Sequence, residues 1–130
     1  MAKKLADKKI KIDAFVSSPA KRAKKTCKYF TKEFDPKKDN VILESKLYEA
    51  GTQNFFDVVE NLKDKWDSVA IFSHNPGITD FANSLTSARI DNIPTCGIFA
   101  VKADAKHWSD FKKAEKEFLF FEYPKAEVEG

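Results

Sequence analysis

Two segments of the chain repeat the same order of residue types, and this repetition limits the fold more than any other feature. In residues 12–17 (IDAFVS), and again in residues 69–73 (VAIFS), a short apolar run ends in small polar residues. A proline follows shortly after each run, and the sequence beyond it changes to helical spacing. Proline is well tolerated at the first position of a helix, and Ser18 is the expected N-cap of the first one. Both segments therefore predict a strand that passes directly into a helix.

The spacing of apolar residues continues this alternation along the chain. From Ala20 to Phe34, and again after Thr52, which we expect to cap the next helix, apolar residues recur at intervals of three and four. The pair Asp35-Pro36 should stop the first of these helices. We expect strands at residues 12–17, 41–44, 69–73, 98–101 and 118–123, and helices after Ser18, after Thr52, at 76–86 and at 107–117.

Strands that alternate with helices of roughly 10 to 15 residues are typical of parallel pairing with helices on both faces of the sheet. A chain of 130 residues has the size of one domain, and its 12 Phe and 2 Trp are enough for a packed core. The predicted fold class is therefore a single α/β sandwich domain over residues 1–130. In such sheets, ligands bind beyond the carboxyl ends of the strands, where Ser17-Ser18 and Ser73-His74 are expected.

The charge and the cysteine content argue against several classes of protein. The 23 basic residues nearly balance the 20 acidic ones, and only Arg22 and Arg89 are arginines, so no nucleic-acid partner is expected. Cys27 and Cys96 are too few for a disulfide framework and lack metal-ligand spacing, so we expect reduced thiols, a cytoplasmic protein and no metal. No apolar run approaches the roughly 18 residues of a membrane span, so no membrane partner is expected. Glycine-rich phosphate loops are also absent from the sequence, and no cofactor is expected.

Arg22 and His74 are the main candidate site residues. Arg22 falls in the first turn of its helix, where the partial positive charge of the helix terminus repels a cation unless an anion such as phosphate lies between them. Helix N–H groups and a bidentate guanidinium together can bind an oxyanion, so Ser18 and Asn75, at the two helix starts, are further phosphate-binding candidates. The alternative is that Arg22 is a solvated surface residue and His74 a structural cap or rim histidine.

Glu49 and His107 are two further residues of types that can take part in catalysis. Glu49, in a loop after a predicted strand, can act as a general acid if burial raises its pKa, whereas an exposed glutamate only solvates its loop. His107 lies at a predicted helix start and is expected to be at the surface or half-buried. The acidic residues do not cluster as a magnesium site would require.

The run SSPAKR (17–22), followed later in the chain by SHNPG (73–77), resembles the histidine phosphatase superfamily. The most similar branch is the short phosphohistidine phosphatases of SixA type, which LYEA (47–50) and NIPTCG (92–97) also fit. The resemblance implies a three-layer α/β/α sandwich with a mainly parallel, phosphoglycerate mutase-like sheet, and a phosphatase that uses no metal. It also implies that Arg22 and His74 bind and stabilise the transferring phosphoryl group, so phosphate or vanadate is an expected ligand.

The sequence departs from that family at the nucleophile. The family's nucleophile is a histidine in an Arg-His-Gly or Arg-His-Ala motif at the end of the first, central strand, and no such motif occurs here. Residues 2–9 resemble the helix that follows this strand in the family. We therefore expect that the first strand is missing from this chain, either because the chain is an N-terminally truncated form of a longer one or because it has lost the nucleophile. The expected consequences are marginal stability or self-association, and phosphate binding with negligible turnover.

Three functions remain as hypotheses. The first is a phosphatase that removes a phosphoryl group from phosphohistidine in a protein or from a small phosphomonoester. The short chain leaves little room for a lid, which favours the protein substrate. The second is a non-catalytic phosphate-binding regulatory module. The third is a general α/β interaction domain in which Arg22 and His74 are only structural.

Overall fold

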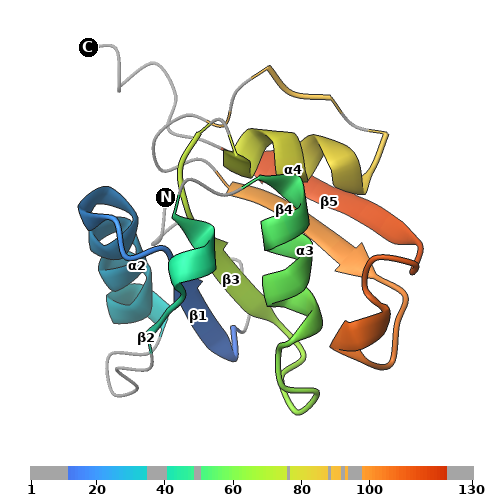
Figure 1. Ribbon diagram of the computed structural model, residues 1–130, viewed down its shortest axis with the longest axis horizontal. Coiled ribbons are helices and arrows are strands. Elements are labelled where there is room, and N and C mark those ends of the chain that lie inside the picture. Colours follow the sequence, from blue (N-terminus) through green and yellow to red (C-terminus); the bar gives the residue numbers. More distant parts are fainter. Residues whose placement is uncertain are drawn as a thin grey trace.

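Strands and helices alternate through the part of the chain that the computed structural model describes, which comprises residues 12–34, 41–48, 51–75, 77–87, 89–91, 93 and 98–122. The α/β class predicted from the spacing is therefore confirmed. In chain order, the elements are β1 (Ala14–Ser17), α2 (Lys21–Phe34), β2 (Val41–Leu43), the 3-10 helix η1 (Ser45–Leu47), α3 (Thr52–Glu60), β3 (Val69–Phe72), α4 (Gly77–Leu85), β4 (Ile98–Ala103), the 3-10 helix η2 (Trp108–Asp110) and β5 (Lys116–Glu122) (Figure 1).

β1 is the middle strand of a three-stranded parallel sheet with the order β2-β1-β3. Ser17, the last residue of β1, pairs with Leu43 of β2 and with Phe72 of β3. All four residues of β1 are buried, as expected of a strand covered on both faces. Because the strands are parallel and in this register, all three end together at one edge of the sheet.

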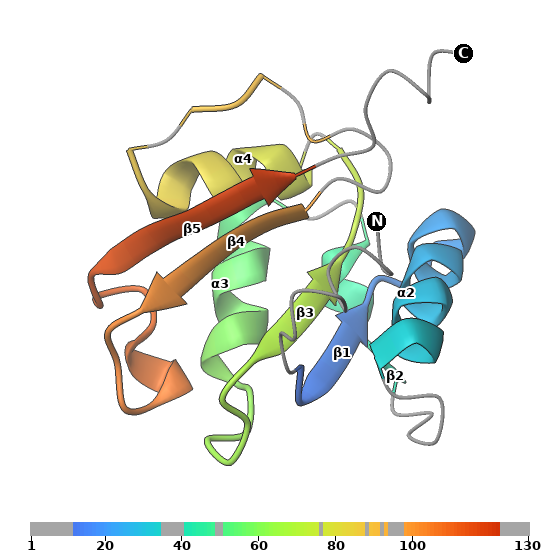
Figure 2. The ribbon, with the colours of Figure 1, turned by 180° about the vertical axis from the view of Figure 1, so that it is seen from behind.

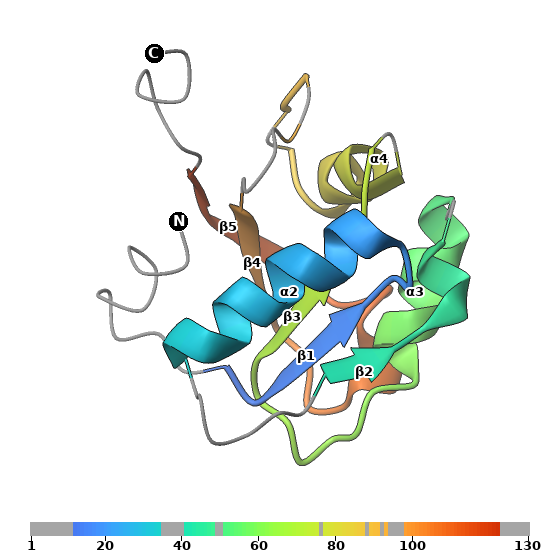
Figure 3. The same ribbon diagram turned by 90° about the vertical axis from the view of Figure 1, so that its left-hand side faces the viewer.

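Helices cover both faces of this sheet, because neighbouring residues of a strand point to opposite sides. Phe15 packs with Cys27 and Phe30 of α2. The next residue, Val16, belongs to a second cluster that includes Phe55 and the apolar faces of α3 and α4. The helices α2 and α3 therefore lie on opposite sides of the strands (Figure 3). This is the three-layer α/β/α arrangement that the sequence resemblance implied.

β4 and β5 form a separate antiparallel sheet of two strands. Its register is irregular between Ala100 and Val101. Figure 2 shows β4 beside β3, with the two strands pointing in opposite directions. Within the described residues, no backbone ladder joins β3 to β4. The central layer of strands is therefore divided into two sheets.

The start of α3 differs from the sequence prediction. Thr52 is the first residue of the helix rather than its cap, and the N-cap is Gly51. The Gly51 N–H donates to the side-chain oxygen of Asn54 (3.1 Å), which satisfies one of the donors near the helix start. Asn61 is the C-cap, so the helix ends at Glu60.

The prediction of a helix at residues 107–117 is wrong. Only the single turn of η2 and a following turn form there, and Lys116 already pairs with Ala103 of β4. The spacing of Trp108 and Phe111 fits one helical turn as well as a longer helix. Strand pairing across the hairpin decided between the two, and it lengthened β5 at the expense of the helix.

Candidate functional site

The carboxyl ends of the three parallel strands meet where the sequence predicted the site. The N–H of Ser18, directly after β1, donates to the carbonyl of Phe72, the last residue of β3 (2.8 Å). The carbonyl of Ser17 accepts a bond from the N–H of Glu44, directly after β2 (2.9 Å). The loops that follow β1 and β3 therefore start from the same edge of the sheet.

Ser18 and Arg22 lie on the short path from β1 into α2. Ser18 is fully buried, and its side-chain oxygen accepts a bond from the N–H of Ala20 (3.2 Å). This bond closes the turn before α2, which begins only at Lys21, so Ser18 is not the immediate N-cap of the helix. Arg22, in the first turn of α2, is exposed and can therefore meet an anion from solution.

The start of α2 is strongly basic. Its first turn contains Lys21 and Arg22 and no acidic residue, and Lys24 and Lys25 follow. The N-terminus of a helix already carries about half a positive charge, so these side chains add to an unfavourable local potential. A phosphate at this edge would be attracted by the helix terminus and by the side chains together.

His74 directly follows Ser73 at the end of β3 and is partly buried. Its ring lies edge-on to that of Tyr48, with 5.9 Å between the ring centroids and 90° between the planes. The hydroxyl of Ser73 donates to the carbonyl of Leu47 (2.9 Å), which ties the end of β3 to η1. Neighbouring residues therefore restrict both the ring and the backbone of this segment. Sequence reasoning did not select Tyr48, although its place just after β2 and η1 puts it at the same sheet edge.

Asn75, near the start of α4, takes part in a small hydrogen-bond network. Its amide group donates to the carbonyl of Ile93 (2.8 Å), and its side-chain oxygen accepts a bond from the hydroxyl of Thr79. The Thr79 oxygen in turn accepts a bond from the N–H of Ile93 (2.9 Å). The network fastens Ile93 to the start of α4. Asn75 therefore has a structural role, and its contact with phosphate stays a prediction.

The remaining predicted residues lie elsewhere. Glu49 is outside the described residues. His107 is exposed, as expected, and its Nδ1 lies 2.8 Å from a carboxylate oxygen of Asp64. His107 contacts Asp64, which precedes β3, whereas His74 directly follows β3. The two histidines of the chain therefore lie near opposite ends of this strand.

No group of three or more His, Cys, Asp or Glu side chains that could hold a metal ion occurs in the described ranges. Among the helices formed by these residues, none is long and apolar enough to cross a membrane.

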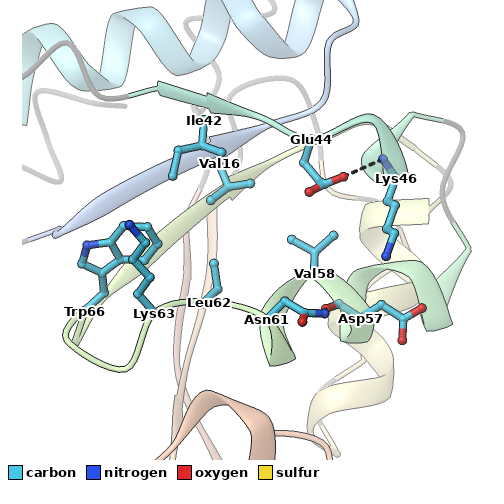
Figure 4. A pocket seen from close by; sticks show the side chains of 10 residues that line it. All are labelled: Val16, Ile42, Glu44, Lys46, Asp57, Val58, Asn61, Leu62, Lys63 and Trp66. Carbon is cyan, nitrogen blue, oxygen red and sulfur yellow. Dashed lines mark hydrogen bonds between the residues drawn. The ribbon is translucent and has the colours of Figure 1, made fainter.

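A cavity of about 360 Å³ lies between α3 and the sheet (Figure 4). Its lining includes the apolar side chains of Val16, Ile42 and Leu62 and the charged side chains of Lys46 and Asp57. The four candidate residues that the structure describes do not line this cavity: Ser18, Arg22, His74 and Asn75.

By fold, the chain is similar to phosphohistidine phosphatases of SixA type. A candidate phosphohistidine phosphatase SixA from Nakamurella multipartitia has a TM-score of 0.77 and 16% identity, over 96% of this chain and 80% of that one. A second, from Agrobacterium tumefaciens, has a TM-score of 0.68 and 18% identity, over 95% and 75% of the two chains. The protein histidine phosphatase SixA complexed with tungstate has a TM-score of 0.75 and 18% identity, over 92% and 74%. By sequence, the chain matches no family model and no curated protein. The SixA-like fold implied by the sequence resemblance is therefore confirmed.

Proposed function

We propose that this chain is a phosphohistidine phosphatase domain that binds the phosphoryl group of phosphohistidine in a protein or of a small phosphomonoester. The SixA-like fold supports this proposal, and one similar structure is a complex with tungstate, a tetrahedral oxyanion like phosphate. The observation that carries the proposal is the bond between Ser18 and Phe72, which joins the ends of β1 and β3. The segments that contain Arg22 and His74 both begin directly after these two strand ends.

We assign to Arg22 and His74 the stabilisation of the phosphoryl group during transfer. Phosphoryl transfer depends mainly on positioning and on charge stabilisation at the oxygens of the moving group. A guanidinium can contact two of these oxygens at once, and the N–H groups at the start of α4 are further donors close to His74. In this assignment the side chains supply the positive charge without a metal ion.

The part of the chain that the structure describes offers no second histidine placed to act as the nucleophile. A phosphohistidine intermediate needs a histidine that faces His74 across the phosphoryl group, and the sequence contains only one other histidine, His107, which lies at the far end of β3. Burial raises the pKa of the Cys27 thiol to about 12, so this thiol stays protonated and unreactive at neutral pH. We therefore propose that residues 1–130 bind phosphate with negligible turnover.

The same site without a nucleophile also fits a non-catalytic phosphate-binding module. The two hypotheses differ in whether a histidine from outside residues 1–130 completes the site. Fusing a strand-forming segment that ends in Arg-His before Met1 distinguishes them. A gain of phosphatase activity that His74→Ala removes supports the enzyme, whereas retained phosphate binding without activity supports the module.

The short connections at the strand ends favour a protein substrate. Only residues 18–20 separate β1 from α2, and only residues 73–76 separate β3 from α4. Neither connection is long enough to form a lid over a small metabolite. An open site of this kind can accept a phosphorylated side chain that projects from a partner protein.

Phosphate or vanadate should raise the melting temperature of the chain. A ligand present at about 100 times its Kd stabilises the folded state by about 2.7 kcal/mol. We expect Arg22→Ala to abolish most of this stabilisation, because it removes the bidentate donor. Lys25→Ala is the matched control, since Lys25 is exposed on the same helix and carries the same charge. If both variants lost the phosphate-induced stabilisation equally, phosphate binding would depend only on the overall positive charge of α2.

A small aryl phosphate should not be hydrolysed by the chain above the rate in buffer. The physical reason is the missing histidine opposite His74, without which no covalent intermediate forms. The release of the phenol can be followed by absorbance over the pH range from weakly acidic to neutral. Ready hydrolysis that disappears in His74→Ala would contradict the proposal and reveal a nucleophile that we have not identified.

A further inference from the structure

Tyr48 is an exposed aromatic residue that lies beside His74. It is 54% exposed, although most of its side chain is an apolar ring. A single exposed tyrosine is common on protein surfaces and indicates little by itself. This one follows η1 at the edge where the parallel strands end, and its ring centroid is 5.9 Å from that of His74. The exposed ring therefore borders the proposed phosphate site.

The backbone around Tyr48 is held in place from two sides. Its N–H donates to the carbonyl of Ser45 (3.0 Å), which makes Tyr48 the C-cap of η1. The preceding residue, Leu47, is 0% exposed and belongs to the core cluster that includes Val16 and Phe55. As described above, the carbonyl of Leu47 also accepts the bond from the hydroxyl at the end of β3. A ligand that meets the Tyr48 ring therefore need not first order the loop that carries it.

The contact with His74 leaves at least one face of the Tyr48 ring open. The two ring planes are at 90°, so one ring directs its edge at the other. A ring has two faces, and an edge-to-face contact covers at most one of them. Among the described residues, no second ring packs against Tyr48. Aromatic rings prefer offset-stacked or edge-to-face partners, and the open face can take one from solution.

The substrates that the proposed function leaves open differ in the group next to the phosphorus atom. In phosphohistidine, the phosphorus is bonded directly to a nitrogen of the flat imidazole ring. In an alkyl phosphomonoester, it is bonded through oxygen to a saturated carbon, which has no aromatic face. When His74 contacts the phosphoryl group, this carrier group lies next to the contact and within reach of Tyr48. A flat carrier can stack on the open face, whereas a saturated carrier cannot.

We infer that Tyr48 is a specificity-determining residue that stacks on the ring that carries the phosphoryl group. The site then favours a phosphoryl group on imidazole or on another flat ring over one on a saturated alcohol. The inference rests on the proposed function, because the phosphoryl group must lie at Arg22 and His74 for its carrier to meet Tyr48. The ring of Tyr48 makes the selection, and its hydroxyl is not required.

Three ligands that do not depend on turnover test this inference on the full chain. They are phenylphosphonate, cyclohexylphosphonate and inorganic phosphate. The two phosphonates have the same number of carbon atoms and the same charged group, but only the phenyl ring is flat and aromatic. Isothermal titration calorimetry gives the Kd of each ligand. We expect phenylphosphonate to bind about threefold to tenfold more tightly than cyclohexylphosphonate, which is the range expected of one ring-to-ring contact.

Variants of Tyr48 assign this preference to the ring. Tyr48→Phe should keep the ratio of the two Kd values, and Tyr48→Leu, which is apolar but not aromatic, should bring it to about one. Tyr29→Leu is the matched control and should keep the ratio, because Tyr29 is 60% exposed but lies about two turns along α2 from Arg22. Comparing two ligands within each variant cancels a general change in phosphate affinity. Nuclear Overhauser contacts between the phenyl protons and the Tyr48 ring should appear in the natural chain.

The outcomes separate this inference from the proposed function. A ratio of about one in a natural chain that binds inorganic phosphate would overturn the inference alone. A ratio that persists in Tyr48→Leu would also overturn it, since another group would then select the ring. Loss of the ratio in Tyr48→Phe would overturn it in favour of the hydroxyl. Absence of binding of all three ligands would overturn the proposed function and the inference together.

Discussion

Thr79 is a buried residue whose hydroxyl serves two partners at once. It is 6% exposed, it donates to the side chain of Asn75, and it accepts a bond from the N–H of Ile93, which is itself 8% exposed. A buried polar group costs free energy when it has no partner. The position of the segment around Ile93 therefore depends on this one hydroxyl.

Replacing Thr79 with valine keeps the shape of the side chain but removes both bonds. We expect Thr79→Val to lower the free energy of unfolding by about 1–3 kcal/mol, because the N–H of Ile93 would remain buried without a partner. Urea denaturation measures the change. Ser84→Ala is the control, since Ser84 is exposed on α4 and its hydroxyl donates to the carbonyl of Phe81. Its loss should cost less than about 0.5 kcal/mol. Equal stability of the two variants would show that the network around Thr79 does not stabilise the fold.

At the scale of elements, η2 is fastened to the loop that precedes β3. One carboxylate oxygen of Asp64 accepts a bond from the N–H of Trp108 (3.0 Å), and the other contacts His107. The indole N–H of Trp108 donates to the carbonyl of Trp66 (2.8 Å). These contacts cap η2 from a distant part of the sequence and hold the turn that leads into β5.

The pair of Asp64 and His107 should make stability depend on pH. The bond from the Trp108 N–H, followed by that with His107, lowers the pKa of Asp64 below its usual 3.8, and the bond with Asp64 raises the pKa of His107 above its usual 6.5. A lowered carboxyl pKa stabilises the fold above 3.8, and this contribution is lost as the pH falls through the lowered value. A raised imidazole pKa stabilises the fold below 6.5, and this contribution is lost as the pH rises through the raised value.

We therefore expect the stabilisation by this pair to be greatest between pH 3.8 and 6.5. The difference in melting temperature between the natural chain and His107→Ala should be largest in that window and should shrink toward alkaline pH. Added salt should reduce the difference, because both side chains are exposed. A difference that stays constant across the whole range would mean that His107 contributes by packing and not by charge.

At the scale of the whole molecule, both outer sheet edges expose large apolar side chains. Ile42 and Leu43 of β2 are 40% and 51% exposed, and Phe118 and Leu119 of β5 are 41% and 47% exposed. In the described part of the chain, β2 and β5 each pair with one neighbour only. Apolar strands with an open edge are typical sites of association between chains.

We expect the chain to self-associate as its concentration rises to roughly 100 μM, because these outer edges can pair between molecules. Sedimentation velocity measures the change in mass. Leu43→Lys and Leu119→Lys should each reduce association, since a charge at a strand edge opposes pairing. Tyr29→Lys is the control, because Tyr29 is 60% exposed but lies on α2. A monomer at all concentrations would contradict the expectation.

Local sequence patterns determined the order of strands and helices through most of this molecule. The apolar runs that end before Ser18-Pro19 and before His74-Asn75-Pro76 predicted the junctions of β1 with α2 and of β3 with α4. Such predictions succeed because a proline, a capping side chain and the spacing of apolar residues act on their immediate neighbours. The meeting of the strand ends also followed from the sequence, since parallel strands joined by helices end at one edge. The roles of Arg22 and His74 at that edge remain predictions.

Only the tertiary structure decided the pairing of the last two strands and the side-chain contacts between distant residues. The spacing of Trp108 and Phe111 predicted a helix at 107–117, but pairing of β5 with β4 and the bond from Trp108 to Asp64 replaced most of it. The division of the strands into two sheets and the ring contact of Tyr48 with His74 likewise join parts of the chain that no local pattern relates. The physical reason is that hydrogen bonds and apolar contacts depend on distance in space, whereas propensity and capping depend on distance along the chain.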